Sequence, residues 1–270
     1  MSKWTEGYVT TNGFRMHYYH TGGDKPPLVV SHGITDDGLC WTRFARAMEA
    51  DYDVIMPDAR GHGLSETVPG PFTWEDQAED LAGFIRGLGL DHPLVGGHSM
   101  GAATSFYLAA SHPELLSKLF LEDPPFRATE PTPAQREERG AAMRHEALAR
   151  SKMTLEEIAA AGRKEHPGWA DEEFGPWAAA KQRVRIETAA VVRPPESRTW
   201  RQALPMIKCP TLLITGDPER GGIVTPETAA EAQKLLPGLK IVRLRGAGHN
   251  VRREAFDAYV AAVRAFLAGQ

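Results

Sequence analysis

The sequence predicts an α/β protein with a mostly parallel central sheet that is covered by helices on both faces. Short apolar runs of strand length alternate with amphipathic helical segments along most of the chain, which is typical of such sheets. The alternation stops between residues 132 and 204, where only helical patterns occur, and it then resumes. We expect this helical stretch to be an all-helical cap inserted into the sheet domain.

The first half of the predicted sheet domain begins with a hairpin. Asn12-Gly13 separates strand-like runs at residues 8–11 and 14–20, and Asn-Gly is the strongest short hairpin signal. The remaining elements of this half are strands at 28–30, 52–56, 94–95 and 119–121, and helices at 40–50, 74–88 and 102–110.

The predicted cap and the second half of the sheet domain follow. Thr154 and Glu157 form a capping-box pattern at the start of one cap helix. The cap helices are expected at 132–150, 154–165, 171–192 and 197–204, and the later core elements at 211–214, 225–235, 241–244 and 251–267. We therefore predict a core formed by residues 1–124 and 206–270, with the cap over residues 125–205.

The composition suits a cytoplasmic protein that acts on a small molecule. The chain has 270 residues, of which 42% are hydrophobic, so it can bury a full core. A net charge of −4 gives no electrostatic case for binding nucleic acid or a membrane. No signal peptide or membrane-spanning run is evident, and no signal of oligomeric state. The two cysteines, Cys40 and Cys209, fit neither a disulfide framework nor a metal motif and are interpreted as buried thiols.

A candidate nucleophile lies where a short strand passes directly into a helix. Ser99 is the central residue of a Gly-x-Ser-x-Gly pattern formed with Gly97 and Gly101. The glycines suit a turn at which the backbones of strand and helix pass too close for a larger side chain. The pattern therefore predicts a sharp turn that presents the Ser99 hydroxyl above the end of the sheet.

A serine hydroxyl needs a neighbouring base, which is usually a histidine held by a carboxylate. His249 follows the last predicted strand, flanked by glycines, and is the candidate base. Asp217, which follows the strand at 211–214, is the preferred acid, because the order serine, acid, histidine suits this topology. Glu219 is the second choice, and Asp123, after the strand at 119–121, is the third.

Negative charge that develops on the substrate oxygen requires two backbone N–H donors. Met100 follows the nucleophile and is expected to supply one of them. Ile34 lies in the loop after the strand at 28–30 and is expected to supply the other. Asp36 and Asp37 follow closely and are interpreted mainly as solvated turn acids, with contact to substrate or ordering of the loop as the alternative.

Other polar residues receive structural interpretations. His98 adjoins the serine, but its side chain is expected to point away, so we interpret it as packing or orienting. Asp58 is interpreted as a structural residue paired with Arg60. His17 carries no supporting pattern and is expected at the surface.

Together these residues resemble the α/β-hydrolase fold superfamily. The segments that carry the resemblance are His32-Gly33, Asp58-Ala59-Arg60-Gly61-His62-Gly63-Leu64-Ser65, Gly97-His98-Ser99-Met100-Gly101, Asp217 and Gly248-His249. The resemblance implies a serine hydrolase of the esterase, lactonase and C–C hydrolase group that uses no metal or other cofactor. In that family the acid commonly lies about three residues after the glycine, which is the position of Glu219, whereas Asp217 follows its glycine directly.

The expected reaction is hydrolysis of a carboxylic ester or lactone of a small, largely apolar substrate through an acyl-enzyme. C–C bond hydrolysis or perhydrolysis on the same residues is one alternative, and a ligand-binding homologue with low turnover is another. Aromatic residues of the predicted cap are interpreted mainly as its own small core, with one or two of them lining the substrate pocket. These residues are Trp169, Phe174, Trp177 and Trp200.

Overall fold

A single eight-stranded sheet organises the protein, and the computed structural model describes residues 4–189 and 196–269. The strands are β1 (Thr5–Thr11), β2 (Phe14–His20), β3 (Pro27–Ser31), β4 (Asp53–Pro57), β5 (Leu94–His98), β6 (Lys118–Glu122), β7 (Thr211–Thr215) and β8 (Leu239–Arg243). Their order across the sheet is β1-β2-β4-β3-β5-β6-β7-β8. The β1–β2 and β2–β4 pairs are antiparallel and all other pairs are parallel, which confirms the expected mostly parallel sheet.

The predicted hairpin joins β1 to β2. Thr11 pairs with Phe14, so Asn12 and Gly13 form a two-residue turn. Both turn residues have positive φ, at 45° and 82°, which a tight turn of the hairpin type requires.

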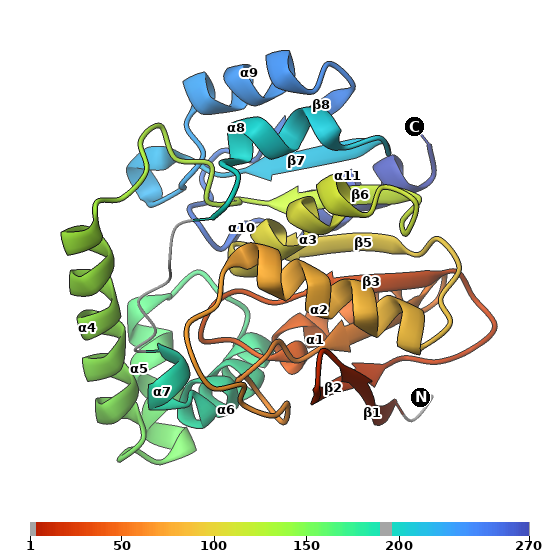
Figure 1. Cartoon of the computed structure of the whole chain (residues 1–270). Helices are drawn as coiled ribbons and strands as arrows, with labels where there is room; N and C mark the ends of the chain where they lie inside the picture. The colour runs from red at the N-terminus through yellow and green to blue at the C-terminus, as the bar shows by residue number, and fades with distance from the viewer. Residues whose placement is uncertain (1–3, 190–195, 270) are drawn as a thin grey trace.

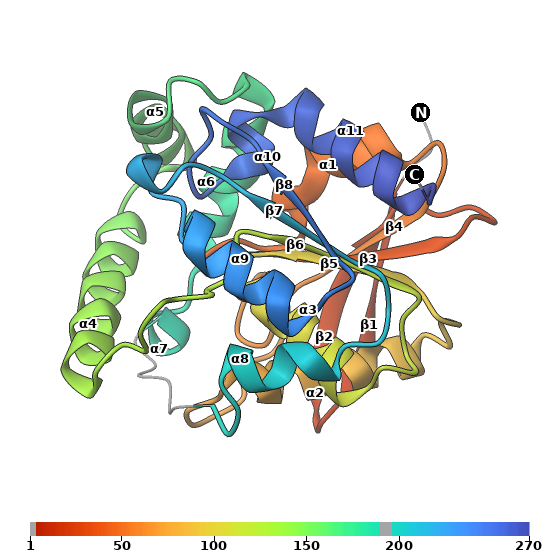
Figure 2. The ribbon, with the colours of Figure 1, turned by 90° about the horizontal axis from the view of Figure 1, so that it is seen from above.

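Helices cover both faces of the sheet, as expected (Figure 2). The core helices are α1 (Thr42–Met48), α2 (Trp74–Gly87), α3 (Met100–Ser111), α8 (Trp200–Ala203), α9 (Pro226–Leu235), α10 (Val251–Glu254) and α11 (Phe256–Leu267). In Figure 2, α1, α10 and α11 lie on one face and α2, α3, α8 and α9 on the other. Each face buries its own apolar cluster, with Phe84 and Phe106 in one and Phe44 and Tyr259 in the other.

The segment between β6 and β7 carries the inserted helices, which we call the cap helices. They are α4 (Pro133–Arg150), α5 (Leu155–Glu165), α6 (Phe174–Arg183) and α7 (Ile186–Ala189). They lie beyond the carboxyl ends of the parallel strands, at the left of Figure 1. The predicted capping box at Thr154 is present. Trp169, Phe174 and Trp177 form a separate apolar cluster with Ile158, so these aromatics do build the cap's own core.

The helical stretch differs from the prediction in two places. The helix expected at 171–192 is broken into a 3-10 turn at Asp171–Glu173, then α6 and α7, and its residues 190–192 lie outside the described part of the chain. The helix expected at 197–204 becomes α8 followed by a 3-10 turn, and Trp200 packs into the core of the sheet domain rather than the cap. The domain bounds at residues 125 and 205 stay a prediction.

A buried carboxylate ties together the loops beside the sheet. Asp58 accepts hydrogen bonds from the backbone N–H groups of Gly38 at 2.7 Å and Leu64 at 2.9 Å. It also accepts one from Nδ1 of His17 at 2.9 Å. His17 is fully buried, so the expectation that it lies at the surface is wrong. The structural role expected for Asp58 is confirmed, with His17 instead of Arg60 as its partner.

Removal of the Asp58 carboxylate leaves several buried donors without an acceptor. We expect Asp58→Ala to lower the free energy of unfolding by about 3 kcal/mol, measured by urea denaturation. Asp24→Ala, at an exposed acid, is the control and should stay within about 0.5 kcal/mol of wild type. A loss below about 1 kcal/mol for Asp58→Ala would contradict this role.

Candidate active site

Ser99 lies on the sharp turn between β5 and α3. Its backbone angles are φ 52° and ψ −110°, a conformation that residues other than glycine rarely adopt. Its N–H donates to the carbonyl oxygen of Glu122 at 3.0 Å, which anchors the turn to β6. A Cβ atom at Gly97 would lie 2.4 Å from the carbonyl group of Gly101, and one at Gly101 would lie 2.1 Å from the carbonyl oxygen of Ser31. The predicted turn with closely approaching backbones is therefore present.

The imidazole of His249 contacts a carboxylate from the strand beside the serine. Its Nδ1 lies 2.5 Å from Oδ2 of Asp123, which is fully buried and directly follows β6. The Asp123 carboxylate also accepts N–H groups from Ile223 at 2.8 Å and Val224 at 3.0 Å. Because Nδ1 donates to the carboxylate, Nε2 remains as the acceptor that a general base needs.

Asp217 is not the carboxylate that contacts His249, and the expectation that placed it there is corrected. Its Oδ1 accepts from Nε and Nη2 of Arg243 at 3.0 and 2.7 Å, and its Oδ2 accepts from the N–H of Gly246 at 2.7 Å. The hydrogen bond from Gly246 has the largest effect on the pKa of Asp217, and together with the bonds from Arg243 it lowers that pKa. Its carboxylate thus connects the end of β7 to the end of β8. The Glu219 side chain is 70% exposed and lies 3.9 Å from Arg243.

The sequence did contain a signal for Asp123. It is the first residue after β6, and β6 pairs with β5 in parallel, so the ends of the two strands lie at the same edge of the sheet. Its φ of 41° turns the chain sharply at that edge. A carboxylate at this point can approach a histidine that comes from the loop after β8.

Ile34 and Met100, the expected donors to the oxyanion, lie around the same cavity as Ser99 and His249. Ile34 is in a turn closed by a hydrogen bond from the N–H of Asp36 to the carbonyl oxygen of Gly33 at 3.1 Å. Met100 is the first residue of α3. N–H groups in the first turn of a helix point toward its N-terminal end, where the helix dipole favours negative charge.

Asp36 holds the loop of Ile34 against the cap, and the expectation that it is solvated is wrong. It is buried, and its carboxylate contacts Nζ of Lys181 on α6 at 2.7 Å and Nη2 of Arg253 on α10 at 3.1 Å. Burial alone raises the pKa of Asp36, but the charges of Arg253, Lys181 and Arg252 outweigh it and hold the pKa well below its usual range. Its role is therefore to order the loop.

Asp37 provides a second connection between this loop and the cap, and it too is buried, contrary to expectation. Its Oδ2 accepts a hydrogen bond from Nη1 of Arg183 at 3.2 Å. Burial, reinforced by the nearby charge of Asp58, raises the pKa of Asp37 to about 7.

His98 orients the loop of His249, in line with its predicted packing or orienting role. Its Nε2 donates to the backbone carbonyl oxygen of His249 at 3.0 Å, and the two rings lie 4.7 Å apart between centroids. Burial lowers the pKa of His98 well below its usual value, so the ring is neutral.

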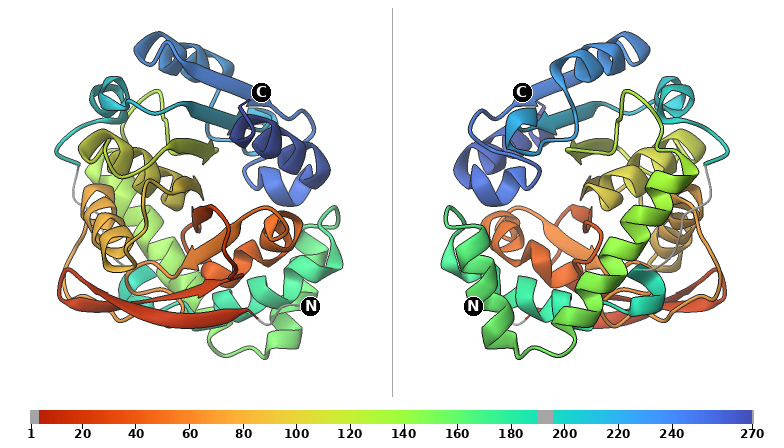
Figure 3. Two further views of the ribbon diagram at one scale, coloured as in Figure 1. Left: turned by 90° about the vertical axis from the view of Figure 1, so that its right-hand side faces the viewer. Right: turned by 90° about the vertical axis from the view of Figure 1, so that its left-hand side faces the viewer.

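A cavity of about 650 Å³ opens over Ser99 and His249. Aromatic side chains from the core form part of its wall, and they are Trp74, Phe106, Tyr107 and Trp200. Trp200, which the sequence predicts to lie in the cap, thus lines the cavity as a core residue. Arginine side chains from α4 and from the segment before it form another part of the wall. The right-hand view of Figure 3 shows α4 crossing this end of the molecule.

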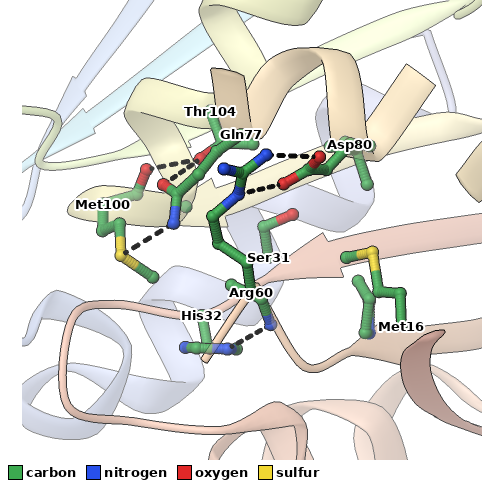
Figure 4. A pocket seen from close by; sticks show the side chains of 12 residues that line it. Met16, Ser31, His32, Arg60, Gln77, Asp80, Met100 and Thr104 are labelled. Atoms are coloured by element: carbon green, nitrogen blue, oxygen red, sulfur yellow. Dashed lines mark hydrogen bonds and ion pairs between the residues drawn. The ribbon is translucent and has the colours of Figure 1, made fainter. Parts of the chain in front are cut away.

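A second, much smaller cavity of about 20 Å³ lies beside Met100 (Figure 4). Gln77 donates to the sulfur of Met100 at 3.6 Å, and Thr104 donates to the side-chain oxygen of Gln77 at 3.2 Å. Arg60, expected beside Asp58, instead pairs with Asp80 at 2.5 Å. This space is too small for a substrate, and the polar contacts around it support Met100.

Within residues 4–189 and 196–269, no group of three or more metal-ligating side chains is found, and no helix has the length and apolarity to cross a membrane. Cys40 is a buried free thiol, as expected, whereas the free thiol of Cys209 is only partly buried.

A mostly parallel sheet with Ser99 on the turn after β5, and with an Asp123–His249 pair beside it, defines the class of α/β hydrolases. The model of the alpha/beta hydrolase family matches residues 28–262, and the chain belongs to this family. It is therefore a hydrolase enzyme, as the sequence motifs indicated.

Relatives of the chain carry the names of different hydrolases. It is 29% identical over 267 residues to N-formylmaleamate deformylase of Pseudomonas putida, covering 97% of this chain and 96% of that one. It is 26% identical over 262 residues to 2-(acetamidomethylene)succinate hydrolase of Mesorhizobium japonicum, covering 91% and 89%. A thermophilic esterase from Thermogutta terrifontis superimposes with a TM-score of 0.75 at 25% identity, covering 98% of both chains.

The choice of acid can be tested directly. We expect Asp123→Asn to lower kcat by on the order of 10³-fold to 10⁴-fold, because the amide no longer holds His249 as a base. Asp217→Asn is the matched control and should lower kcat by less than about tenfold. The assay is the steady-state hydrolysis of a 4-nitrophenyl ester, and a larger loss in Asp217→Asn than in Asp123→Asn would contradict this assignment.

Proposed function

We propose that the protein hydrolyses a carboxylic ester or lactone through a covalent acyl-enzyme on Ser99. The observation that carries this proposal is the 2.5 Å hydrogen bond between His249 and Asp123 at the cavity that Ser99 also lines. A serine hydroxyl is activated for acyl transfer by an imidazole that is itself held by a buried carboxylate. Ser99, His249 and Asp123 provide these three groups. The arrangement uses no cofactor.

In the first step, Ser99 Oγ attacks the carbonyl carbon of the substrate while Nε2 of His249 takes the hydroxyl proton. Asp123 stabilises the resulting imidazolium. The negative charge on the substrate oxygen is held by the N–H groups of Ile34 and Met100. The carbon–oxygen bond to the leaving group then breaks, and His249 donates its proton to the departing alcohol.

In the second step, water replaces the leaving group. His249 Nε2 takes a proton from that water as its oxygen attacks the acyl-enzyme carbonyl, and the same two N–H groups hold the second oxyanion. Collapse of this intermediate returns the proton to Ser99 and releases the carboxylic acid. For a lactone, the alcohol and the acid belong to one product molecule.

Cleavage of an amide on the same residues is the second candidate. It is favoured by the relatives that match most of the chain, one of which is named a deformylase. The chemistry differs only in the leaving group, which must be protonated by His249 before it departs as an amine. Parallel assays of an ester and the amide of the same acyl group would rank the two reactions.

The nucleophile is tested by Ser99→Ala. We expect kcat toward a 4-nitrophenyl ester to fall by on the order of 10³-fold or more, with KM nearly unchanged, because only the attacking atom is lost. An organophosphonate should add to Ser99 of the wild-type protein, read by peptide mass spectrometry, and not to the variant. Ser117→Ala, at an exposed serine, should behave as wild type. A Ser99→Ala variant that kept most of its activity would refute the mechanism.

A further inference from the structure

Three arginines line the cavity that holds Ser99 and His249. Arg127 lies on the segment that follows Asp123, and Arg136 and Arg139 lie on α4. Residues 136 and 139 are three positions apart, so they project from one side of the helix. Gly140 and Met143 line the cavity from that same side.

This pattern reverses the usual one for a helix that covers a cavity. The side of a helix that faces the interior is normally apolar, and charged side chains lie on the opposite side. On α4, Arg136, which is partly buried, and Arg139, which is exposed, both line the cavity, whereas Arg144 is exposed and lies outside the cavity lining. Two positive charges at the cavity wall indicate that this wall meets a ligand of opposite charge.

The guanidinium groups of Arg127, Arg136 and Arg139 have no ion-pair partner within 4 Å among the described residues. Arginines elsewhere in the structure are paired, as Arg201 is with Glu231 at 2.5 Å. Burial and then the neighbouring charge of Arg139 lower the pKa of Arg127, and they outweigh the opposite effect of the charges of Asp123 and Glu130, so the guanidinium groups of Arg127 and Arg139 lie close together. Binding of an anion would reduce the electrostatic repulsion among these guanidinium groups.

The two carboxylates in the cavity wall do not neutralise the cluster. Glu196 accepts the backbone N–H groups of Trp74 at 3.0 Å and Glu75 at 3.2 Å, so its charge is engaged at the start of α2. Glu130 is exposed, and no ion pair joins it to an arginine within the described part of the chain. Positive charge therefore predominates on this wall.

We propose that Arg127, Arg136 and Arg139 form a carboxylate-binding subsite, and that the substrate is an ester or lactone that carries a second, free carboxylate. The planar guanidinium forks suit bidentate hydrogen bonds to a carboxylate. The aromatic wall then accommodates the carbon chain between that carboxylate and the scissile carbonyl. This inference rests on the proposed function and replaces the largely apolar substrate expected from the sequence with an amphipathic, anionic one.

A matched pair of esters tests the subsite. Mono-(4-nitrophenyl) glutarate carries the free carboxylate, and 4-nitrophenyl pentanoate has the same chain length without it. We expect wild-type kcat/KM to be at least about tenfold higher for the anionic ester, because charge-assisted hydrogen bonds strengthen its binding. Added salt should reduce this preference, since part of it is electrostatic.

Single substitutions show which arginines cause the preference for the anionic ester. Arg127→Gln, Arg136→Gln and Arg139→Gln should each lower kcat/KM for the glutarate ester by about tenfold and change the pentanoate ester by less than about twofold. Arg144→Gln, on the same helix but outside the cavity, is the matched control and should change neither. Arg139→Lys should recover part of the loss, because the charge returns without the fork.

Binding to Ser99→Ala separates this inference from the proposed function. We expect mono-(4-nitrophenyl) glutarate to bind the variant at least about tenfold more tightly than 4-nitrophenyl pentanoate by calorimetry, and Arg139→Gln in that background to abolish the difference. Equal binding of the two esters to the variant, or arginine variants that affect both esters alike, would overturn the subsite. If neither ester is cleaved and Ser99 is not labelled, the hydrolytic proposal fails, while the binding result still decides the subsite.

Discussion

A buried network of charges centred on Asp36 holds the candidate site together. Its carboxylate contacts Lys181 from the cap and Arg253 from the helix that follows the histidine loop. Arg252, the residue before Arg253, donates to Glu122, which directly precedes the acid that contacts the imidazole. The network therefore joins the loop that contains Ile34 and Asp36, the cap helix α6, the helix after His249 and β6. Loss of one partner from such a buried set lowers the free energy of unfolding by about 3–5 kcal/mol, so the segments that the network joins hold one another in place.

Strain is concentrated where this network meets the sheet. Ser99 and Asp123 both have positive φ, at 52° and 41°, at the ends of the adjacent strands β5 and β6. The N–H of Ser99 bonds the carbonyl oxygen of Glu122, so the two strained turns support each other. Such conformations persist only where the surrounding structure determines them, and here they place Ser99 at the cavity and the Asp123 carboxylate against His249.

Core and cap contribute different properties to that cavity. The core supplies the serine, the imidazole and an aromatic wall, and the cap helix α4 supplies guanidinium groups. In the function that we propose, the reacting groups thus come from elements fixed by the sheet, whereas two of the three arginines that we propose to select the ligand come from an inserted helix. Relatives that match most of the chain carry different substrate names, as expected if the core is retained and the cap varies.

The alternation of strands and helices, the hairpin, the turn at Ser99 and the position of His249 after the last strand could be predicted from the sequence, because each has a local signal in spacing or turn chemistry. The sequence did not separate Asp123 from Asp217, since both follow strands and precede the histidine. Contacts in the folded protein distinguish the two acids, because Arg243 pairs with Asp217, whereas the pairing of β6 with β5 brings Asp123 to the imidazole. Burial of acids beside distant cations, and the side of α4 that faces the cavity, likewise depend on contacts between segments far apart in the chain.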